Sequence, residues 1–169
     1  MESKHWYAMY VKMHHEKKTA EKLNKMGIIN YLPLQEVIKE WSDRKKKIKQ
    51  VVIPMMIFIK TDEKTRIEVL NLISSINGTL INKATHKPAI IREEEMDRFM
   101  FMLDYSESAV QFITEPMIPG EKVEVIKGPL RGLSGEFVES NGKAHVSVRV
   151  NMLGCAIVDI PQAYLKKLG

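Results

Sequence analysis

The sequence contains a single cysteine, Cys155, among its 169 residues. One thiol cannot build an internal disulfide framework, and such usage is typical of a reducing cytoplasm. Long apolar runs are also absent: the longest, at residues 51–59, is interrupted by Pro54, whereas a membrane-spanning helix needs about 20 residues. The first residues carry charge and no apolar segment, so no secretory signal is expected. We therefore expect a cytoplasmic protein, and we also expect it to be a monomer.

Constellations that support catalysis or metal binding are missing as well. His14 and His15 are adjacent, so on a helix they cannot share a metal ion as a pair four residues apart could. Cys155 has no neighbouring histidine or second thiol, and no glycine-rich phosphate loop is present. We therefore expect no enzyme, no catalytic or metal-binding residues and no cofactor.

Charge and glycine are distributed unevenly along the chain. Residues 1–105 hold nineteen basic and fourteen acidic residues, whereas residues 106–169 hold seven of each. Only Gly27 and Gly78 fall in the first part, and the other seven glycines crowd the second. Between the two parts, Pro116 and Pro119 mark a plausible linker. The sequence therefore predicts a first domain at 1–105, a linker at 106–119 and a second domain at 120–169.

The first domain mixes predicted strands and helices, which gives an α+β sandwich with helices over one sheet. Hydrophobic periodicity, capping residues and proline positions define its elements. In chain order these are a strand at 6–13, a helix at 17–26, a strand at 51–60, a helix from Asp62 to Asn77-Gly78, and a helix after Pro88.

The second domain consists of predicted strands and turns. Valines alternate with charged or polar residues at 123–125 and 146–150, as in half-buried strands. Asn141-Gly142 between two such runs is a strong hairpin signal. Because so short a sheet must close to bury a core and protect its edges, we expect a small all-β barrel.

A cationic run separates an apolar segment at 31–38 from the strand at 51–60, so it is expected at a hairpin tip. One interpretation is a solvated loop; the other is contact with nucleic-acid phosphates, since clustered cations gain affinity by releasing counterions. The run carries a net charge of +4, from Lys39, Arg44, Lys45, Lys46, Lys47 and Lys49 against Glu40 and Asp43.

The strand at 51–60 is hydrophobic at every one of its first eight positions except Pro54. A sheet covered on one face needs only alternate apolar positions. The surplus side chains, together with Trp6 and Tyr10, are therefore expected to form an exposed apolar patch. The alternative is a sheet buried on both faces.

Residues 120–135 resemble the KOW motif, in which a strand of alternating valines runs into Gly-Pro and ends at a glycine. The corresponding residues are Gly128, Pro129, Gly132 and Gly135. Combined with Trp6-Tyr7, Ile53-Pro54-x-x-x-Phe58 and Lys87-Pro88-Ala89, these residues make the whole chain similar to the NusG family of transcription elongation factors. Residues 6–12 resemble the specialised antiterminator branch typified by RfaH and by regulators of polysaccharide gene clusters.

The resemblance implies an N-terminal domain of the NGN type that binds the clamp helices of bacterial RNA polymerase, followed by a KOW barrel. This chain has Ile53-Pro54-Met55-Met56 where the family usually has Phe-Pro-Gly-Tyr. The implied polymerase-binding residues are Trp6, Tyr10, Ile53, Pro54, Met55, Met56 and Phe58.

The resemblance also implies contact with non-template DNA or nascent RNA in the elongation complex. The KOW domain would meet a ribosomal protein or another factor near Leu153. The implied nucleic-acid-binding residues are Lys12, His14, Arg44, Lys45, Lys46, Lys47, Lys64 and Arg66.

Three hypotheses follow. The first is an elongation or antitermination factor that suppresses pausing or termination on selected operons, and the second is a general elongation factor of the same family. The third is a KOW-type ribosomal or RNA-binding protein. Such proteins usually carry strongly basic barrels, whereas residues 106–169 are neutral.

Overall fold

The computed structural model describes residues 3–169, which form two compact units. The N-terminal unit comprises the chain up to Pro33 together with Ile53–Glu93, and the C-terminal unit comprises Leu34–Val52 together with Glu94–Gly169. This division differs from the predicted boundary after residue 105. The cationic hairpin and the third helix belong to the C-terminal unit, because the contacts they make there are with later parts of the chain.

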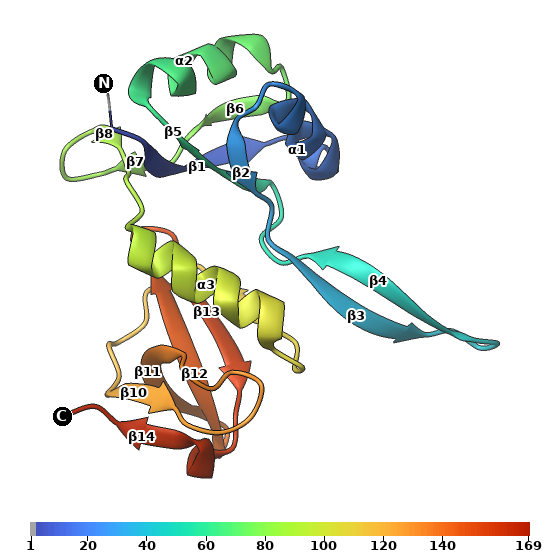
Figure 1. Ribbon diagram of the computed structural model, residues 1–169, viewed down its shortest axis with the longest axis vertical. Helices are drawn as coiled ribbons and strands as arrows, with labels where there is room; N and C mark the ends of the chain where they lie inside the picture. The colour runs from blue at the N-terminus through green and yellow to red at the C-terminus, as the bar shows by residue number, and fades with distance from the viewer. Residues whose placement is uncertain (1–2) are drawn as a thin grey trace. The chain divides into compact units, whose positions relative to one another are not determined.

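The N-terminal unit contains a four-stranded antiparallel sheet with strand order β2-β5-β1-β6 (Figure 1). The mixed α and β composition predicted for this part of the chain is confirmed. Its elements are β1 (His5–Val11), α1 (Glu16–Lys25), β2 (Ile29–Tyr31), β5 (Met56–Thr61), α2 (Glu63–Leu72), β6 (Ile76–Thr79), β7 (Ile81–Asn82) and β8 (Lys87–Pro88).

The central strand β1 is buried on both faces along most of its length, and Tyr10 near its end is exposed. Tyr7, Met9 and Val11 point into a core that they share with residues of α1, α2, β5 and β6. On the other face, Ala8 is fully buried, and so is Phe58, its cross-strand partner on β5. Burial on both faces explains why β1 and β5 lack the alternation of a strand with one wet face.

Helix α2 begins where the sequence predicts and ends earlier. The Asp62 carboxylate accepts a hydrogen bond from the Thr65 backbone N–H at 2.7 Å, and this bond holds the pKa of Asp62 below its usual value. The predicted end at Asn77-Gly78 is wrong: the chain becomes extended at Ile73, and Gly78 lies in β6 opposite Tyr10. Pairing with β1 thus overrides the apolar pattern that continues to Ile76.

The C-terminal unit contains a two-stranded hairpin, a helix and a six-stranded antiparallel sheet with strand order β14-β10-β11-β12-β13-β9 (Figure 1). Asn141 and Gly142 form the tight turn between β11 and β12, both with positive φ, so the predicted hairpin is confirmed. The elements are β3 (Leu34–Glu40), β4 (Lys45–Val51), α3 (Glu93–Tyr105), β9 (Gln111–Ile113), β10 (Lys122–Val125), β11 (Ser134–Ser140), β12 (Lys143–Val150), β13 (Gly154–Asp159), the short 3-10 helix η1 (Gln162–Tyr164) and β14 (Leu165–Lys167).

Two segments that the sequence analysis places in the linker and in the first domain lie against this sheet. Strand β9 lies inside the predicted linker and pairs with β13. Helix α3 lies along the sheet (Figure 1), where the Phe99 and Phe112 rings are 5.8 Å apart and the Asn151 backbone N–H donates to Glu95 Oε1 at 3.2 Å. These contacts join residues that are far apart in the sequence, so no local sequence pattern predicts them.

Candidate functional site

The seven residues implied in polymerase binding lie on β1, on β5 and in the turn before β5. Four are buried, with 6% exposure or less: Trp6, Ile53, Met56 and Phe58. Three are exposed and form what we call the turn surface: Tyr10, Pro54 and Met55. The predicted exposed patch is therefore smaller than expected, and β5 follows the alternative, a strand buried on both faces.

The backbone of the turn before β5 is held on two sides. The Val11 N–H donates to the Met55 carbonyl oxygen at 3.0 Å, and the Met55 N–H donates to Oε2 of the buried Glu16 at 3.5 Å. Met55 has a φ of 63°, in the left-handed region that favours glycine. The turn therefore presents a methionine side chain, 41% exposed, at a position where that side chain costs backbone strain.

Tyr10 stands next to this turn. Its register partner on β5 is Met56, and its partner on β6 is Gly78. A Cβ atom at Gly78 would lie 3.9 Å from Tyr10 Cδ2, so the tyrosine ring lies beside a position without a side chain. The structure thus brings Tyr10 and the Pro54-Met55 turn together at one end of the central strands β1 and β5, with 41% of Tyr10 exposed.

The predicted nucleic-acid-binding residues of the N-terminal unit do not form one cluster. Lys12 and His14 are exposed in the β1–α1 loop, where His14 has a φ of 65°. Lys64 is exposed on the first turn of α2. These residues therefore belong to two separate elements, the β1–α1 loop and α2.

Arg66 is buried, which does not fit its predicted contact with nucleic acid. Its guanidinium donates to both Glu63 carboxylate oxygens, at 3.0 and 2.6 Å, and to Thr79 Oγ1 at 2.9 Å. It also lies 5.6 Å from the centre of the Tyr7 ring. Hydrogen bonding by Arg66 lowers the pKa of Glu63, while burial raises the pKa of Tyr7. Arg66 is thus a structural residue that ties α2 to β6.

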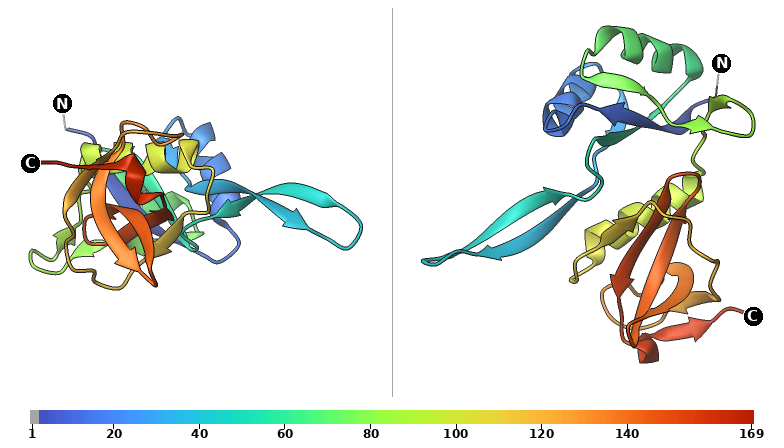
Figure 2. Two further views of the ribbon diagram at one scale, coloured as in Figure 1. Left: turned by 90° about the horizontal axis from the view of Figure 1, so that it is seen from below. Right: turned by 180° about the vertical axis from the view of Figure 1, so that it is seen from behind.

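The cationic run forms the tip of the β3–β4 hairpin, as predicted. In Figures 1 and 2 this ribbon extends away from α3 and from the six-stranded sheet. The register pairs Lys39 with Lys46 and Glu40 with Lys45, so neighbouring lysines of the run point to opposite faces of the hairpin. Lys45 forms an exposed ion pair with Glu40 at 3.2 Å. The run is therefore two different surfaces rather than one cationic patch.

The glycines of the KOW-like motif occupy positions that demand glycine. Gly128 and Gly132 have φ values of 84° and 95°. A Cβ atom at Gly135 would lie 2.6 Å from the Ser147 carbonyl oxygen. Leu153 is half-buried in the β12–β13 loop, beside a cavity of about 210 Å³. The motif is therefore structural, and Leu153 lies at a hollow where a partner side chain could enter.

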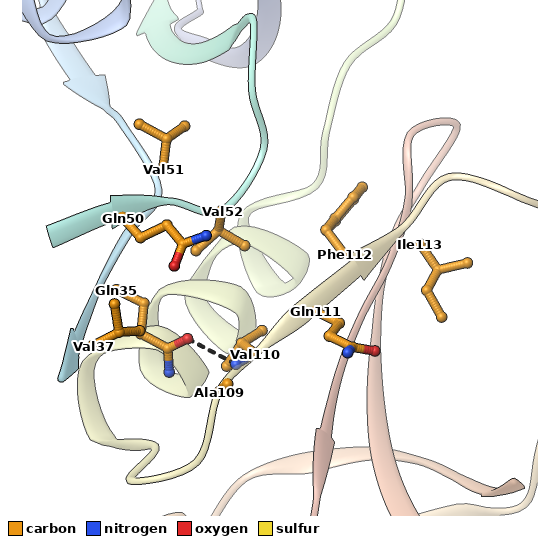
Figure 3. A pocket seen from close by; sticks show the side chains of 10 residues that line it. All are labelled: Gln35, Val37, Gln50, Val51, Val52, Ala109, Val110, Gln111, Phe112 and Ile113. Carbon is orange, nitrogen blue, oxygen red and sulfur yellow. Dashed lines mark hydrogen bonds between the residues drawn. The ribbon is translucent and has the colours of Figure 1, made fainter. Parts of the chain in front are cut away.

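Gln35 is a residue whose role the sequence did not reveal. Its side-chain amide donates to the Ser108 carbonyl oxygen at 2.8 Å and accepts from the Val110 N–H at 2.7 Å, the latter drawn in Figure 3. These bonds fasten the base of the hairpin to the segment before β9, beside a cavity of about 440 Å³ (Figure 3). A lone glutamine at 7% exposure gives no pattern from which this role could be predicted.

Within residues 3–169, no group of three or more histidine, cysteine, aspartate or glutamate side chains is arranged to hold a metal ion. In the same part of the chain, no helix is long and apolar enough to cross a membrane. The candidate sites in this part of the chain are an apolar turn, a cationic hairpin and a hollow at Leu153.

One comparison with known proteins, a match to a family model, assigns the chain to a family. The family model described as "Transcription termination factor nusG" matches residues 4–100, more than half of the chain. Among solved structures, the chain is similar to those described as the crystal structure of the MjSpt4:Spt5 complex, conformations A and B. The identities are 14% and 16%, the TM-scores are 0.32 and 0.33, and the alignments cover 97% of this chain and 98% and 97% of the others. Comparison with curated proteins finds no match.

Proposed function

The chain belongs to the NusG family of transcription factors, and on that premise we propose that it is an elongation or antitermination factor for selected operons. Proteins of this family are non-enzymatic and work with RNA polymerase. In the proposed action, the N-terminal unit binds the clamp helices of the polymerase and suppresses pausing or termination. The observation that carries this proposal is the turn surface of Tyr10, Pro54 and Met55, which lies within the family-matching residues.

The turn surface has the composition and support of a protein-binding site. Tyrosine and methionine are enriched at interfaces because they bring large contact areas. The residues on either side of the turn, Ile53 and Met56, are buried and anchor its two ends. Backbone strain of the kind seen at Met55 is concentrated at functional sites, where the surrounding structure holds it in place. These features support a rigid apolar contact for a helical partner.

Replacing Tyr10 with aspartate is expected to weaken binding to RNA polymerase at least tenfold. A carboxylate in an apolar interface loses its water without gaining a partner. Because Tyr10 is 41% exposed, the fold should remain intact. The measurement is the affinity of the purified full-length variant for core polymerase.

The matched control is Ile29→Asp, which places the same charge on β2 of the same sheet at a residue that is 51% exposed. It should bind polymerase like the unmodified protein. A folded Tyr10→Asp protein that binds as tightly as the Ile29→Asp control would remove the turn surface from the proposed site.

Replacing Met55 with glycine is expected to reduce polymerase binding while changing the stability by less than about 1 kcal/mol. Glycine relieves the left-handed strain but increases the entropy of the unfolded chain, so the two effects largely offset each other. Met152→Gly is a close control, since Met152 has a φ of 68° and is 48% exposed. Denaturation curves and polymerase affinity together check the result; equal losses of affinity in both variants would contradict the proposed role of Met55.

For the six-stranded sheet we propose a KOW domain that binds a ribosomal protein or another protein factor through a surface including Leu153. The neutral charge of residues 106–169 supports a protein partner over nucleic acid. The hollow of about 210 Å³ beside Leu153 offers a place for an apolar side chain.

Operon selectivity is a separate part of the proposal. A selective factor engages polymerase only after a recruiting DNA or RNA element, whereas a general factor engages most transcription units. Sequencing nucleic acid recovered with the tagged protein and its polymerase distinguishes the two. Enrichment of a few transcription units is the expected result, and uniform recovery across the genome would show a general factor.

A further inference from the structure

The end of the β3–β4 hairpin holds a tryptophan among cations. The backbone N–H of Trp41 donates to the Arg44 carbonyl oxygen at 2.8 Å, and the Arg44 N–H donates back at 3.3 Å. These two residues therefore close the loop formed by Ser42 and Asp43. Arg44 Cζ lies 5.4 Å from the centre of the Trp41 ring, and Lys46 Nζ lies 5.8 Å from it. Nevertheless, Trp41 remains 49% exposed.

The register places these side chains on one face of the hairpin. Lys39 pairs with Lys46, and Trp41 with Arg44, so all four project to the same side, which we call the tip face. The opposite face carries Glu36 and Glu40 across from lysines. Among the paired strand residues, the tip face thus has three cations and no acid, while the other face is partly neutralised.

This arrangement reduces the stability of the hairpin. Like charges directly opposite each other destabilise a strand pair, and Lys39 faces Lys46. An exposed tryptophan also leaves much of its apolar ring in water. The cation–π contacts at Trp41 compensate only in part, because such contacts are weak at exposed sites. The combination is better explained by a ligand that is both anionic and aromatic.

We propose that the tip face binds unpaired nucleotides of a single-stranded nucleic acid. A base stacks on the Trp41 ring, and Lys39, Arg44 and Lys46 contact the flanking phosphates. Aromatic rings beside cations are the recurring solution for single strands, since every base has a flat face and every linkage a negative charge. This inference extends the nucleic-acid contact that the resemblance implies for the cationic run, and it rests on the proposed function as an elongation or antitermination factor.

The chemistry favours a single strand over a duplex. In a duplex the bases are stacked on one another, so only the phosphates would reach the hairpin, and the two faces would differ little. An exposed ring at the very end of a protruding ribbon can reach a base only where the strand is open. Single-stranded DNA and RNA share this chemistry, and the experiment separates them.

The test uses the full-length protein and three fluorescent probes of one sequence, each about 12 nucleotides long: single-stranded DNA, single-stranded RNA and duplex DNA. Trp41→Ala should weaken single-strand binding between about fivefold and a hundredfold. Trp41→Phe should retain most of the affinity, because it keeps a ring. Duplex binding should be unchanged in both variants, and the tighter single strand identifies the natural chemistry.

A pair of charge variants tests the assignment of faces. Lys39→Gln/Lys46→Gln and Lys45→Gln/Lys47→Gln remove the same charge from opposite faces. The first should lose more single-strand affinity and flatten its salt dependence more than the second. Equal losses would overturn the tip face as a site and leave only a general electrostatic attraction.

Two further outcomes would overturn the proposal. One is single-strand binding by folded Trp41→Ala that equals that of the unmodified protein. The other is a loss of affinity for polymerase alone, without nucleic acid, which would make the tip a protein contact. The Tyr10→Asp variant should keep its single-strand affinity, so failure of the polymerase proposal can be distinguished from failure of this one.

Discussion

Replacing Gly135 with alanine is expected to lower the free energy of unfolding by about 3 kcal/mol. The new Cβ would lie 2.6 Å from the Ser147 carbonyl oxygen and 2.8 Å from Val146 Cγ2. The first neighbour is backbone, so it cannot turn aside as the end of a flexible side chain could. Strands β11 and β12 would have to separate locally, and pairing of Gly135 with Val123 on β10 would shift as well.

Gly142→Ala is the control for this change. Gly142 has a φ of 75°, and a Cβ there would meet nothing within 4 Å. Its cost should therefore be the backbone strain alone, about 1 to 2 kcal/mol. Chemical denaturation of both variants checks the difference. Equal destabilisation would mean that the close approach at Gly135 relaxes without cost, and the motif glycine would then need another explanation.

Local signals in the sequence predicted local structure well. The Asp62 cap, the Asn141-Gly142 turn and the cationic hairpin tip all lie where expected. Each depends on residues within a few positions of one another. The types of these residues determine their preferred backbone conformations, so the sequence alone predicts them. The motif glycines Gly128 and Gly132 also have the positive φ values that their pattern suggests.

Burial was the part that local signals could not predict. Met56 and Phe58 were expected in an exposed patch, yet both are at 5% exposure or less. The sequence of an apolar strand is the same whether its second face is buried or exposed to solvent, because burial of that face depends on segments distant in the chain. Arg66 shows the same limit for a charged residue: nothing in its helix sequence distinguishes a solvated arginine from one held by Glu63 and Thr79.

The two faces of the hairpin could be predicted only in part from the sequence. The sequence shows the cations but not their register, and a shift by one residue would move every side chain to the other face. Only the pairing of Lys39 with Lys46 shows that Trp41 shares its face with three cations, while Lys45 is paired with Glu40. The candidate binding site therefore needs the structure, although every residue in it is visible in the sequence.

Helix α3 is expected to be required for folding of the six-stranded sheet. A fragment of residues 94–169 is expected to fold cooperatively, whereas a fragment of residues 106–169, which follows the predicted boundary, should be largely unfolded. The shorter fragment lacks Phe99, which is fully buried and contacts the Phe112 ring, and Glu95, which accepts the Asn151 N–H. Loss of a buried phenylalanine alone costs about 3 to 5 kcal/mol, which is comparable with the whole stability of a small domain.

The measurement is the dispersion of amide signals in NMR spectra, together with denaturation of both fragments. Within the longer fragment, Phe99→Ala should reproduce most of the loss, and Tyr105→Ala, at a residue 56% exposed, should change little. Equal stability of the two fragments would place the boundary after residue 105 and make α3 dispensable for the sheet. If the longer fragment alone is folded, binding of a protein partner near Leu153 can be measured only with α3 present, because α3 holds the β12–β13 loop through Glu95.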